Sequence, residues 1–340
     1  GDNETENQYT RAKKYLDLWM KDGILIRSEK PSFYAYEVIY KVQEVRKRLR
    51  GFLCLLKLEE LGKGSVYPHE RTHPKAKQDR LNLLRTCQAN TSPIFFLYRS
   101  ALGGESQLLS RIAETKPYLQ ANDLSDNLHR LWPIDDPGEI ETVRRELADK
   151  PIFIADGHHR YETSFEYSRE MSVKKTSPSD RKSYDYTRAF LADMTDEGVT
   201  ILPTHRLVRE IPRQIDGMLS GYFESETIAN DFDIRRKLSG RKNVFGFFRK
   251  GETVWHLLTY RGGNLTEVHP DLREIDVFIL DELVIKKILK NAETGYEMDI
   301  ARAFNQVNAG KNAAAFFLNT TQAKVVEKSA LSSMRMSATF

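Results

Sequence analysis

A stretch near the middle of the chain, PIFIADGHHRYE at positions 151–162, places the strongest constraint on the fold. The apolar run 152–154 follows a proline and predicts a buried strand. The pair Asp156-Gly157 then ends this strand with a turn. Beyond the turn, apolar and acidic residues recur one turn apart on separate sides, so we expect a helix that has Asp156 as its N-cap and ends near Met171.

The first turn of this expected helix carries His158, His159 and Arg160. Backbone N–H groups in a first turn lack partners within the helix, and the helix dipole favours negative charge there. The stretch therefore predicts a bound anion, phosphate above all, at the helix start that carries these three residues. The alternative is an ordinary turn with solvated histidines and an arginine paired to a nearby glutamate. Two of the eight histidines stand side by side next to an aspartate and an arginine, which favours the anion site.

The composition is that of a folded protein without an evident macromolecular partner. The 340 residues suffice for two domains, and 40% of them are hydrophobic. With 52 lysines and arginines against 48 aspartates and glutamates, the net charge of +4 is too small to indicate nucleic-acid binding. The two cysteines form neither a disulfide framework nor a zinc pattern, and the apolar runs are too short to span a bilayer. No signal peptide is evident, so we expect a cytoplasmic protein without membrane association.

Residues 69–73 read His-Glu-Arg-Thr-His, which is the spacing of a zinc protease motif. Such a motif needs a continuous helix, because both histidines must face one metal ion. Pro74 follows directly and disfavours helix at His73, and a well-placed third ligand is not evident. A zinc hydrolase is therefore a minor alternative. We expect a helix after Pro74, with His69 and Glu70 in the preceding loop, either as polar site residues or as exposed loop residues.

The remaining pattern alternates helices and strands and predicts an α+β fold with two domains, residues 1–210 and 211–340. Expected helices cover 9–20, 231–238, 275–289, 299–307 and 322–328. Expected strands cover 33–40, 50–58, 187–194, 199–202, 223–228, 243–248, 253–260 and 313–318. The first strand pair encloses a basic tip at 41–50, and helix 275–289 is apolar enough for core or for a homodimer contact. Because the chain starts without Met, we expect a missing front segment.

Six blocks spread over the chain form an ordered set: Pro68-His69-Glu70-x-Thr72; Lys77-x-Asp79-Arg80 with Leu83-Leu84; Ser92-Pro93-Ile94-Phe95 with Leu97-Tyr98; His129-x-Leu131-Trp132; 154–163; and 202–206. In this order they resemble the bacterial and archaeal family catalogued as domain of unknown function 1015, from about residue 9 to residue 340. Two departures stand out. The family's front segment with its Pro-Pro-Tyr-Asp stretch is absent, and the run 334–339 lacks the lysine that the family often has there.

The Asp-Gly-His-His-Arg block is similar to the phosphate-binding motif of the ParB/sulfiredoxin-like fold, and above all to that of archaeal-type free-serine kinases, which use ADP or ATP to phosphorylate serine. The resemblance implies a ParB/sulfiredoxin-like mixed core with inserted elements and a smaller C-terminal α/β domain. It also implies that residues 157–160 hold nucleotide phosphate and that Asp156 lies near a magnesium ion. The serine kinases use an earlier glutamate as the base, which Glu70 matches by order. Catalysis is thus assigned to Glu70, Asp156 and His158.

Phosphoryl transfer needs positive charge around the phosphoryl oxygens, a metal ion, and a carboxylate that accepts the alcohol proton. Arg160 offers a bidentate fork, Asp156 a hard oxygen ligand for Mg²⁺, and Glu70 the base. The residues predicted to bind the anionic group of the substrate are His69, Arg80, His205 and Arg206. The alternative for each of them is a solvated surface position.

The expected function is nucleotide-dependent phosphotransfer to a small hydroxyl compound such as serine. The alternative is a non-enzymatic, ParB-like nucleotide-binding regulator that associates with DNA. The lack of a convincing helix-turn-helix and of a concentrated basic face argues against DNA.

Overall fold

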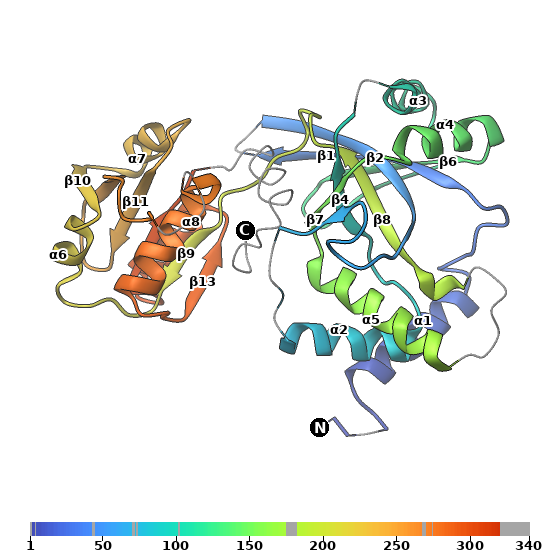
Figure 1. Ribbon diagram of the computed structural model, residues 1–340, viewed down its shortest axis with the longest axis horizontal. Helices are drawn as coiled ribbons and strands as arrows, with labels where there is room; N and C mark the ends of the chain where they lie inside the picture. Colours follow the sequence, from blue (N-terminus) through green and yellow to red (C-terminus); the bar gives the residue numbers. More distant parts are fainter. Residues whose placement is uncertain are drawn as a thin grey trace. The chain divides into compact units, whose positions relative to one another are not determined.

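The computed structural model describes residues 2–3, 5–42, 45–69, 72, 74–100, 103–174, 182–266, 270–273 and 275–319. The chain folds into two compact units that divide between Val199 and Thr200 (Figure 1). The division precedes the expected domain boundary at residue 210, so His205 and Arg206 belong to the second unit. Each unit combines helices with a sheet in which most neighbouring strands are antiparallel, which confirms the α+β class.

The first unit is built on an eight-stranded sheet. In spatial order its strands are β3 (Val66–Tyr67), β7 (Ile152–Asp156), β4 (Ile94–Tyr98), β8 (Tyr186–Asp193), β2 (Val45–Lys57), β1 (Phe33–Val42), β6 (Leu128–Ile134) and β5 (Leu119–Asn122). Strand β4 lies between β7, to which it is antiparallel, and β8, to which it is parallel. The expected β1–β2 hairpin is confirmed, but the expected basic tip is wrong, because Val45–Arg50 is paired strand.

The helices of this unit are α1 (Gln8–Lys21), α2 (Pro74–Cys87), α3 (Gly104–Ala113), α4 (Pro137–Leu147) and α5 (His158–Lys174), with a 3₁₀ turn at Ser183–Asp185. In Figure 1, α3 and α4 lie at the top of the unit and α2 and α5 at its bottom. Leu108 and Val143 bring α3 and α4 into one cluster with Trp132 of β6. Tyr161 of α5 packs in a second cluster with Phe96 of β4. Strands β1, β2 and β6 thus support α3 and α4, whereas β4 and β7 support α5.

Short-range signals explain where several helices begin. The Asn7 side chain accepts the N–H of Thr10, and the hydroxyl of Thr10 accepts the N–H of Asn7, which forms a capping box at α1. Asp136 caps α4 by accepting the N–H of Glu139 at 2.9 Å. Prolines occupy the first position of α2 and α4, where a helix needs no N–H donor.

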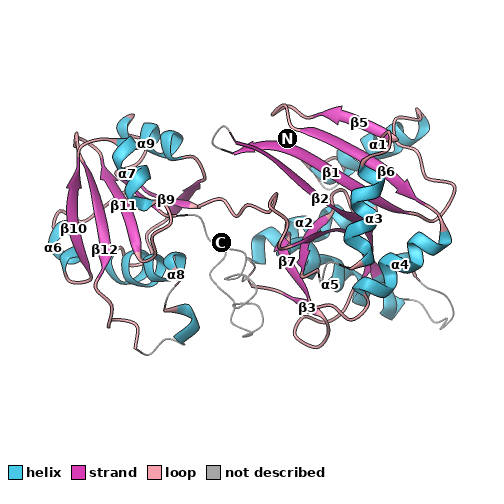
Figure 2. Ribbon diagram, turned by 90° about the horizontal axis from the view of Figure 1, so that it is seen from above, coloured by secondary structure: helices cyan, strands magenta, loops and turns pink. Residues whose placement is uncertain are grey.

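The second unit is a six-stranded antiparallel sheet with helices around it (Figure 2). In spatial order its strands are β10 (Phe223–Ile228), β12 (Trp255–Tyr260), β11 (Val244–Arg249), β14 (Ala314–Phe317), β9 (His205–Val208) and β13 (Thr294–Glu297). Its helices are α6 (Ile215–Ser220), α7 (Asp231–Leu238), α8 (Asp276–Leu280), a π-helix (Asp281–Ile288) and α9 (Ile300–Asn308), with a 3₁₀ turn at Pro270–Leu272. Its core includes a cluster of aromatic rings, in which the ring centroids of Phe248, Trp255 and Phe304 lie 4.7–5.3 Å from one another.

Most of the helices and strands that were predicted for the second half of the chain are present in this unit. The strands expected at 223–228, 243–248, 253–260 and 313–318 and the helices expected at 231–238 and 299–307 are confirmed within one or two residues. The strand expected at 199–202 is wrong, since these residues form no strand. The apolar segment 275–289 divides into α8 and the π-helix, and Ile279, Leu283 and Val284 are completely buried core residues. The helix expected at 322–328 lies outside the described residues.

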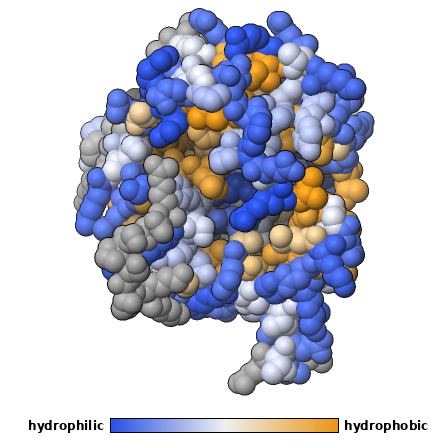
Figure 3. Space-filling view, turned by 90° about the vertical axis from the view of Figure 1, so that its right-hand side faces the viewer, coloured by the Kyte–Doolittle hydropathy of each residue, from blue (hydrophilic) through white to orange (hydrophobic). Residues whose placement is uncertain are grey.

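None of the described helices combines the length and the apolar character needed to cross a membrane. On the face of the molecule seen in Figure 3, hydrophilic residues surround smaller hydrophobic patches. Helix α1 contributes exposed apolar side chains from Tyr15, Leu18, Trp19 and Met20.

Gly51, in the middle of β2, provides a test of the sheet packing. A Cβ at this position would lie 2.6 Å from Cε2 of Phe190 and would also overlap the backbone oxygen of Leu191 on β8. We therefore expect Gly51→Ala to lower the free energy of unfolding by about 1–3 kcal/mol, measured by urea denaturation. Gly217→Ala in α6 is the control, because a Cβ there meets no atom within 4 Å. Equal stability of Gly51→Ala and wild type would contradict the close packing of β2 on β8.

Candidate functional site

The predicted strand–turn–helix is present, and a glycine makes the turn. Strand β7 ends at Asp156 and α5 begins at His158. Gly157 has φ of +99°, and its carbonyl oxygen accepts the N–H of Tyr161 at 2.9 Å. Because this is the first helical hydrogen bond, Gly157 rather than the expected Asp156 occupies the capping position. The helix also continues three residues beyond the expected end, to Lys174.

Arg160 folds back over this turn. Its Nη1 donates to Oγ of Ser92 at 2.9 Å and to the carbonyl oxygen of Pro93, and its Nη2 donates to Oδ2 of Asp156. The positive φ at Gly157 favours glycine, and a Cβ there would lie 2.9 Å from Nη2 of Arg160, so a larger residue would also displace the guanidinium group from its present position. The Asp156 side chain is 72% exposed, and the ion pair with Arg160 is therefore a surface interaction of little energetic value.

Arg160 and Arg80 line one cavity of about 390 Å³. Arg80 comes from α2, and α2 packs along α5. The lining also contains the polar side chains of Asn90, Thr91, Ser92, Thr163 and Ser164. Two guanidinium groups beside several hydroxyl groups form a suitable environment for a phosphate. The structure thus brings together one predicted phosphate-binding residue and one predicted substrate-binding residue.

A second cavity, of about 450 Å³, adjoins the first and shares Leu84, Ala89, Asn90 and Ser164 with it. Its lining adds three tyrosines and two arginines: Tyr167, Tyr184, Tyr186, Arg27 and Arg188. Aromatic rings and guanidinium planes are the groups on which nucleobases stack. None of these five residues was predicted from the sequence, because they come from a loop, from α5, from the 3₁₀ turn and from β8, and they share no motif.

His158 and His69 form a buried pair. Both side chains are 3% exposed, and the backbone N–H of His69 donates to Nε2 of His158 at 3.4 Å. The two rings meet edge to face with 4.6 Å between centroids. Burial lowers the pKa of His69 to about 4. Neither residue lines the two cavities described above, so the arrangement indicates a structural link between the loop before α2 and the start of α5. His159 follows on the same turn and is half-buried.

A second contact links the same loop to α5. The hydroxyl of Thr72 donates to Oε2 of Glu162 at 2.8 Å, and Nζ of Lys77 lies 3.0 Å from the same oxygen. The predicted base Glu70 and the second histidine of the zinc motif, His73, lie outside the described residues. Among the residues that the structure describes, no group of three histidines, cysteines or carboxylates could hold a metal ion.

His205 and Arg206 lie on β9 in the core of the second unit. His205 is completely buried, and its Nδ1 accepts the N–H of Leu318 at 3.2 Å. Arg206 is 1% exposed and donates from Nε and Nη2 to the two carboxylate oxygens of Asp281 at 3.1 and 3.2 Å. Its guanidinium group also lies 4.9 Å from the ring centre of Tyr296. This burial contradicts the predicted substrate-binding role, because a ligand cannot reach either side chain in this arrangement.

The two buried histidines make stability depend on pH. Burial lowers the pKa of His69 and of His205 to about 4, from an ordinary value of 6.5. The unfolded chain therefore binds protons more readily, and the stabilisation present above pH 6.5 is lost as pH falls toward 4. We expect the free energy of unfolding to fall by up to about 1.4 kcal/mol per pH unit for each histidine, measured by urea denaturation across this range. His69→Gln should reduce the slope for the first unit, and an unchanged slope would contradict this origin.

Solved structures show only weak similarity to the chain. A conserved hypothetical protein from Pyrococcus furiosus is 13% identical with a TM-score of 0.39, over 84% of this chain and 87% of that one. A free serine kinase variant in complex with AMP is 12% identical with a TM-score of 0.42, over 84% of each chain. A C-terminally truncated SbnI from Staphylococcus aureus is 9% identical with a TM-score of 0.42, over 84% of this chain and 80% of that one. Similarity at this level gives no information about the candidate site.

A search among curated proteins found no match. The model of one protein family does match, over residues 1–278, which is most of the chain. This match agrees with the resemblance carried by the six ordered blocks. The chain therefore belongs to the family described as "Protein of unknown function (DUF1015)".

Proposed function

We propose that the first unit binds a nucleotide along the two adjoining cavities and transfers a phosphoryl group from it to a small hydroxyl compound. The observation that carries the proposal is that Arg80 and Arg160 line one cavity, and that this cavity adjoins a second one lined by tyrosines. The phosphates would occupy the arginine end, and the base would lie against the tyrosine rings. The two cavities, of about 390 and 450 Å³, are each in the range of small-molecule sites.

The present partners of Arg160 leave it suited to phosphate binding. Two of them, the Ser92 hydroxyl and the Pro93 carbonyl, are neutral, and the third is the exposed carboxylate of Asp156. A phosphate carries more charge than any of these partners and accepts a bidentate pair of hydrogen bonds from a guanidinium group. Arg80 is exposed and adds a second positive charge to the same cavity.

Asp156 fits a magnesium ion in one respect. Mg²⁺ commonly uses one or two protein carboxylates together with substrate phosphates and water, and the exposed carboxylate of Asp156 adjoins the proposed phosphate position. The neighbouring Arg160 would oppose a metal ion there unless phosphate oxygens lay between the two cations. When bound, the ion would supply neutralisation of the phosphate charge. The role of this chain is then to hold the nucleotide so that the phosphoryl group faces the acceptor hydroxyl.

The proposed general base is Glu70. Its described neighbours on either side, His69 and Thr72, both contact the first two turns of α5 through His158 and Glu162. These contacts hold His69 and Thr72 against the start of the helix that also carries Arg160. Glu70 would accept the proton of the acceptor hydroxyl as that oxygen attacks the phosphoryl group. Serine is the first acceptor to test, because the motif resembles that of the free-serine kinases.

Arg160→Gln tests the nucleotide site. We expect wild-type protein to bind ADP or ATP with Mg²⁺ in titration calorimetry, and the variant to bind about tenfold to a hundredfold more weakly, because a charged hydrogen-bond donor to phosphate is lost. Arg169→Gln is the matched control, since Arg169 lies on the same helix but lines a different cavity. Equal affinity of both variants and wild type would remove the proposed phosphate position.

Glu70→Gln separates binding from chemistry. We expect wild-type protein incubated with ADP or ATP, Mg²⁺ and serine to form phosphoserine, and the variant to retain nucleotide affinity while losing most of the turnover. Product is measured by mass spectrometry with a panel of amino acids as acceptors. Nucleotide binding without turnover of any acceptor would favour the non-enzymatic regulator. Unchanged turnover in Glu70→Gln would eliminate this residue as the base.

A further inference from the structure

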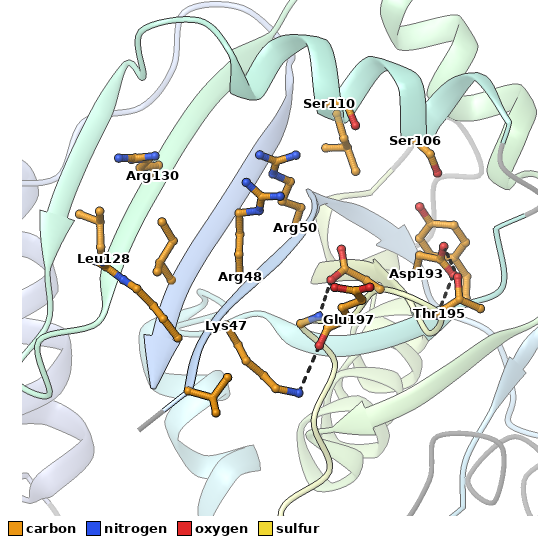
Figure 4. A pocket seen from close by; sticks show the side chains of 17 residues that line it. Lys47, Arg48, Arg50, Ser106, Ser110, Leu128, Arg130, Asp193, Thr195 and Glu197 are labelled. Carbon is orange, nitrogen blue, oxygen red and sulfur yellow. Dashed lines mark hydrogen bonds between the residues drawn. The ribbon is translucent and has the colours of Figure 1, made fainter. Parts of the chain in front are cut away.

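A third cavity, of about 970 Å³, lies at the other end of β4 from the proposed nucleotide site. Ser92 and Pro93 precede the first residue of β4, whereas Tyr98, which lines this cavity, is the last. The cavity is bordered by β1, β2, β6, α3 and the segment 193–198, and it shares no lining residue with the two cavities of the proposed nucleotide site. Figure 4 shows Arg48, Arg50 and Arg130 at one side of it and Asp193, Thr195 and Glu197 at the other.

Strand register places three arginines around one buried glutamate. Glu37 of β1 is directly opposite Arg50 of β2 and Arg130 of β6, so all three residues share a face of the sheet. Glu37 is 2% exposed, and its carboxylate oxygens lie 2.7 Å from Nε of Arg50 and 3.2 Å from Nη1 of Arg130. Nε of Arg48 is 3.9 Å away. One carboxylate therefore faces three guanidinium groups. A second carboxylate, that of Asp196 in the cavity lining, also interacts electrostatically with Arg48 and Arg50.

The same face of these strands is apolar farther along. Ala35 of β1, opposite Phe52 and Trp132, packs beneath α3 and α4. Two residues after Ala35, the same face carries Glu37 and its charged partners Arg50 and Arg130. Arg46, farther along the strand pair, adds another basic residue to the cavity wall. Like charges on neighbouring positions destabilise a sheet unless a counter-charge lies between them. The cavity lining carries Arg46, Lys47, Arg48, Arg50 and Arg130 against Asp193, Asp196 and Glu197. Even with Glu37 counted, positive charge is in excess, and it gathers at the arginine side of the cavity, where a bound anion would offset it.

A second, independent feature of the cavity is an unsatisfied hydroxyl. Tyr98 is completely buried, lines the cavity, and its hydroxyl group has no hydrogen-bond partner among the described residues. An unpaired buried hydroxyl costs about 1–3 kcal/mol, so native structures usually provide a partner. Asp193 is opposite Tyr98 in the sheet register, and its carboxylate already accepts from Thr195 and from the N–H of Ser100. The end of the cavity away from the arginines is thus suited to hydroxyl groups of a ligand.

We propose that this cavity binds a small phosphate ester that carries hydroxyl groups. The phosphate would lie against Arg48, Arg50 and Arg130, and the hydroxyl groups would reach Tyr98 and Asp193. A volume of about 970 Å³ exceeds the needs of inorganic phosphate and accommodates an organic ester. The inference is independent of the proposed nucleotide site, because the two sites have no residue in common.

Titration calorimetry with the full chain tests this inference, with inorganic phosphate and glycerol 3-phosphate as probes. We expect both to bind, the ester more tightly, and Arg130→Gln to weaken both by about tenfold or more. Arg145→Gln is the charge-matched control, because Arg145 is an exposed residue of α4 that does not line the cavity. Arg160→Gln removes the proposed phosphate position of the nucleotide site, so binding that remains in this variant and is lost on the further change Arg130→Gln belongs to the third cavity.

Tyr98→Phe supplies a readout that a purely structural arginine cluster would not change. We expect it to weaken binding of the ester while binding of phosphate stays as in wild type, because only the ester presents hydroxyl groups. If Arg130→Gln does not fold, Arg48→Gln gives the same test, since Arg48 is 58% exposed and its contact with Glu37 is the longest of the three. Absence of binding of either probe to wild type, or equal binding by wild type and the cavity variants, would overturn the proposal.

Discussion

The buried side chain of Tyr161 fixes the position of the candidate site. It is completely buried, packs against Phe96 of β4, and its hydroxyl both donates to the carbonyl and accepts from the N–H of Glu59. Burial raises the pKa of Tyr161 to about 12, so the phenol stays neutral and both hydrogen bonds persist over the ordinary pH range. The first turn of α5 is thereby held against the sheet, and Arg160, one residue earlier, is directed toward the cavity that it shares with Arg80.

Several residues with chemically versatile side chains serve structure in this protein. His69 and His158 pack against each other, and Arg206 is bound by Asp281 inside the second unit. Their side chains are at most 3% exposed, and burial favours the neutral form of an imidazole. An arginine buried in this way stays charged and requires its carboxylate partner. Motif membership alone therefore does not distinguish a residue that contacts a ligand from one that positions a loop.

The first unit carries two cationic cavities whose charges arise in different ways. At the start of β4 the positive charge comes from helices, through Arg80 of α2 and Arg160 of α5. At the end of β4 it comes from strands, where the register of β1, β2 and β6 gathers arginines around Glu37. The sheet between them keeps the two sites apart. The two ligands that we propose would therefore not compete directly for the same residues.

The sequence alone determined the features that depend on neighbours in the chain. The strand–turn–helix around Gly157, the β1–β2 hairpin and the start of α2 at Pro74 follow from apolar runs, glycine conformation and proline geometry, all of which act over a few residues. The ordered blocks were also enough to identify the family. The local features can be predicted from the sequence because each depends on the conformational energetics of a few neighbouring residues.

Only the tertiary structure decided which of these residues share a site. Arg80 and Arg160 are far apart in the sequence and line one cavity because α2 packs on α5. The tyrosine-lined cavity is likewise assembled from separate segments, which contribute Arg27, Leu55, and residues in the ranges 84–90, 164–171 and 183–188. Residues 46–50, expected as a basic tip, became one side of an arginine cluster once β2 paired with β1 and β1 with β6. His205 and Arg206 were placed in a core instead of a site. Burial and register depend on which distant segments pack together, and a local pattern in the chain does not contain that information.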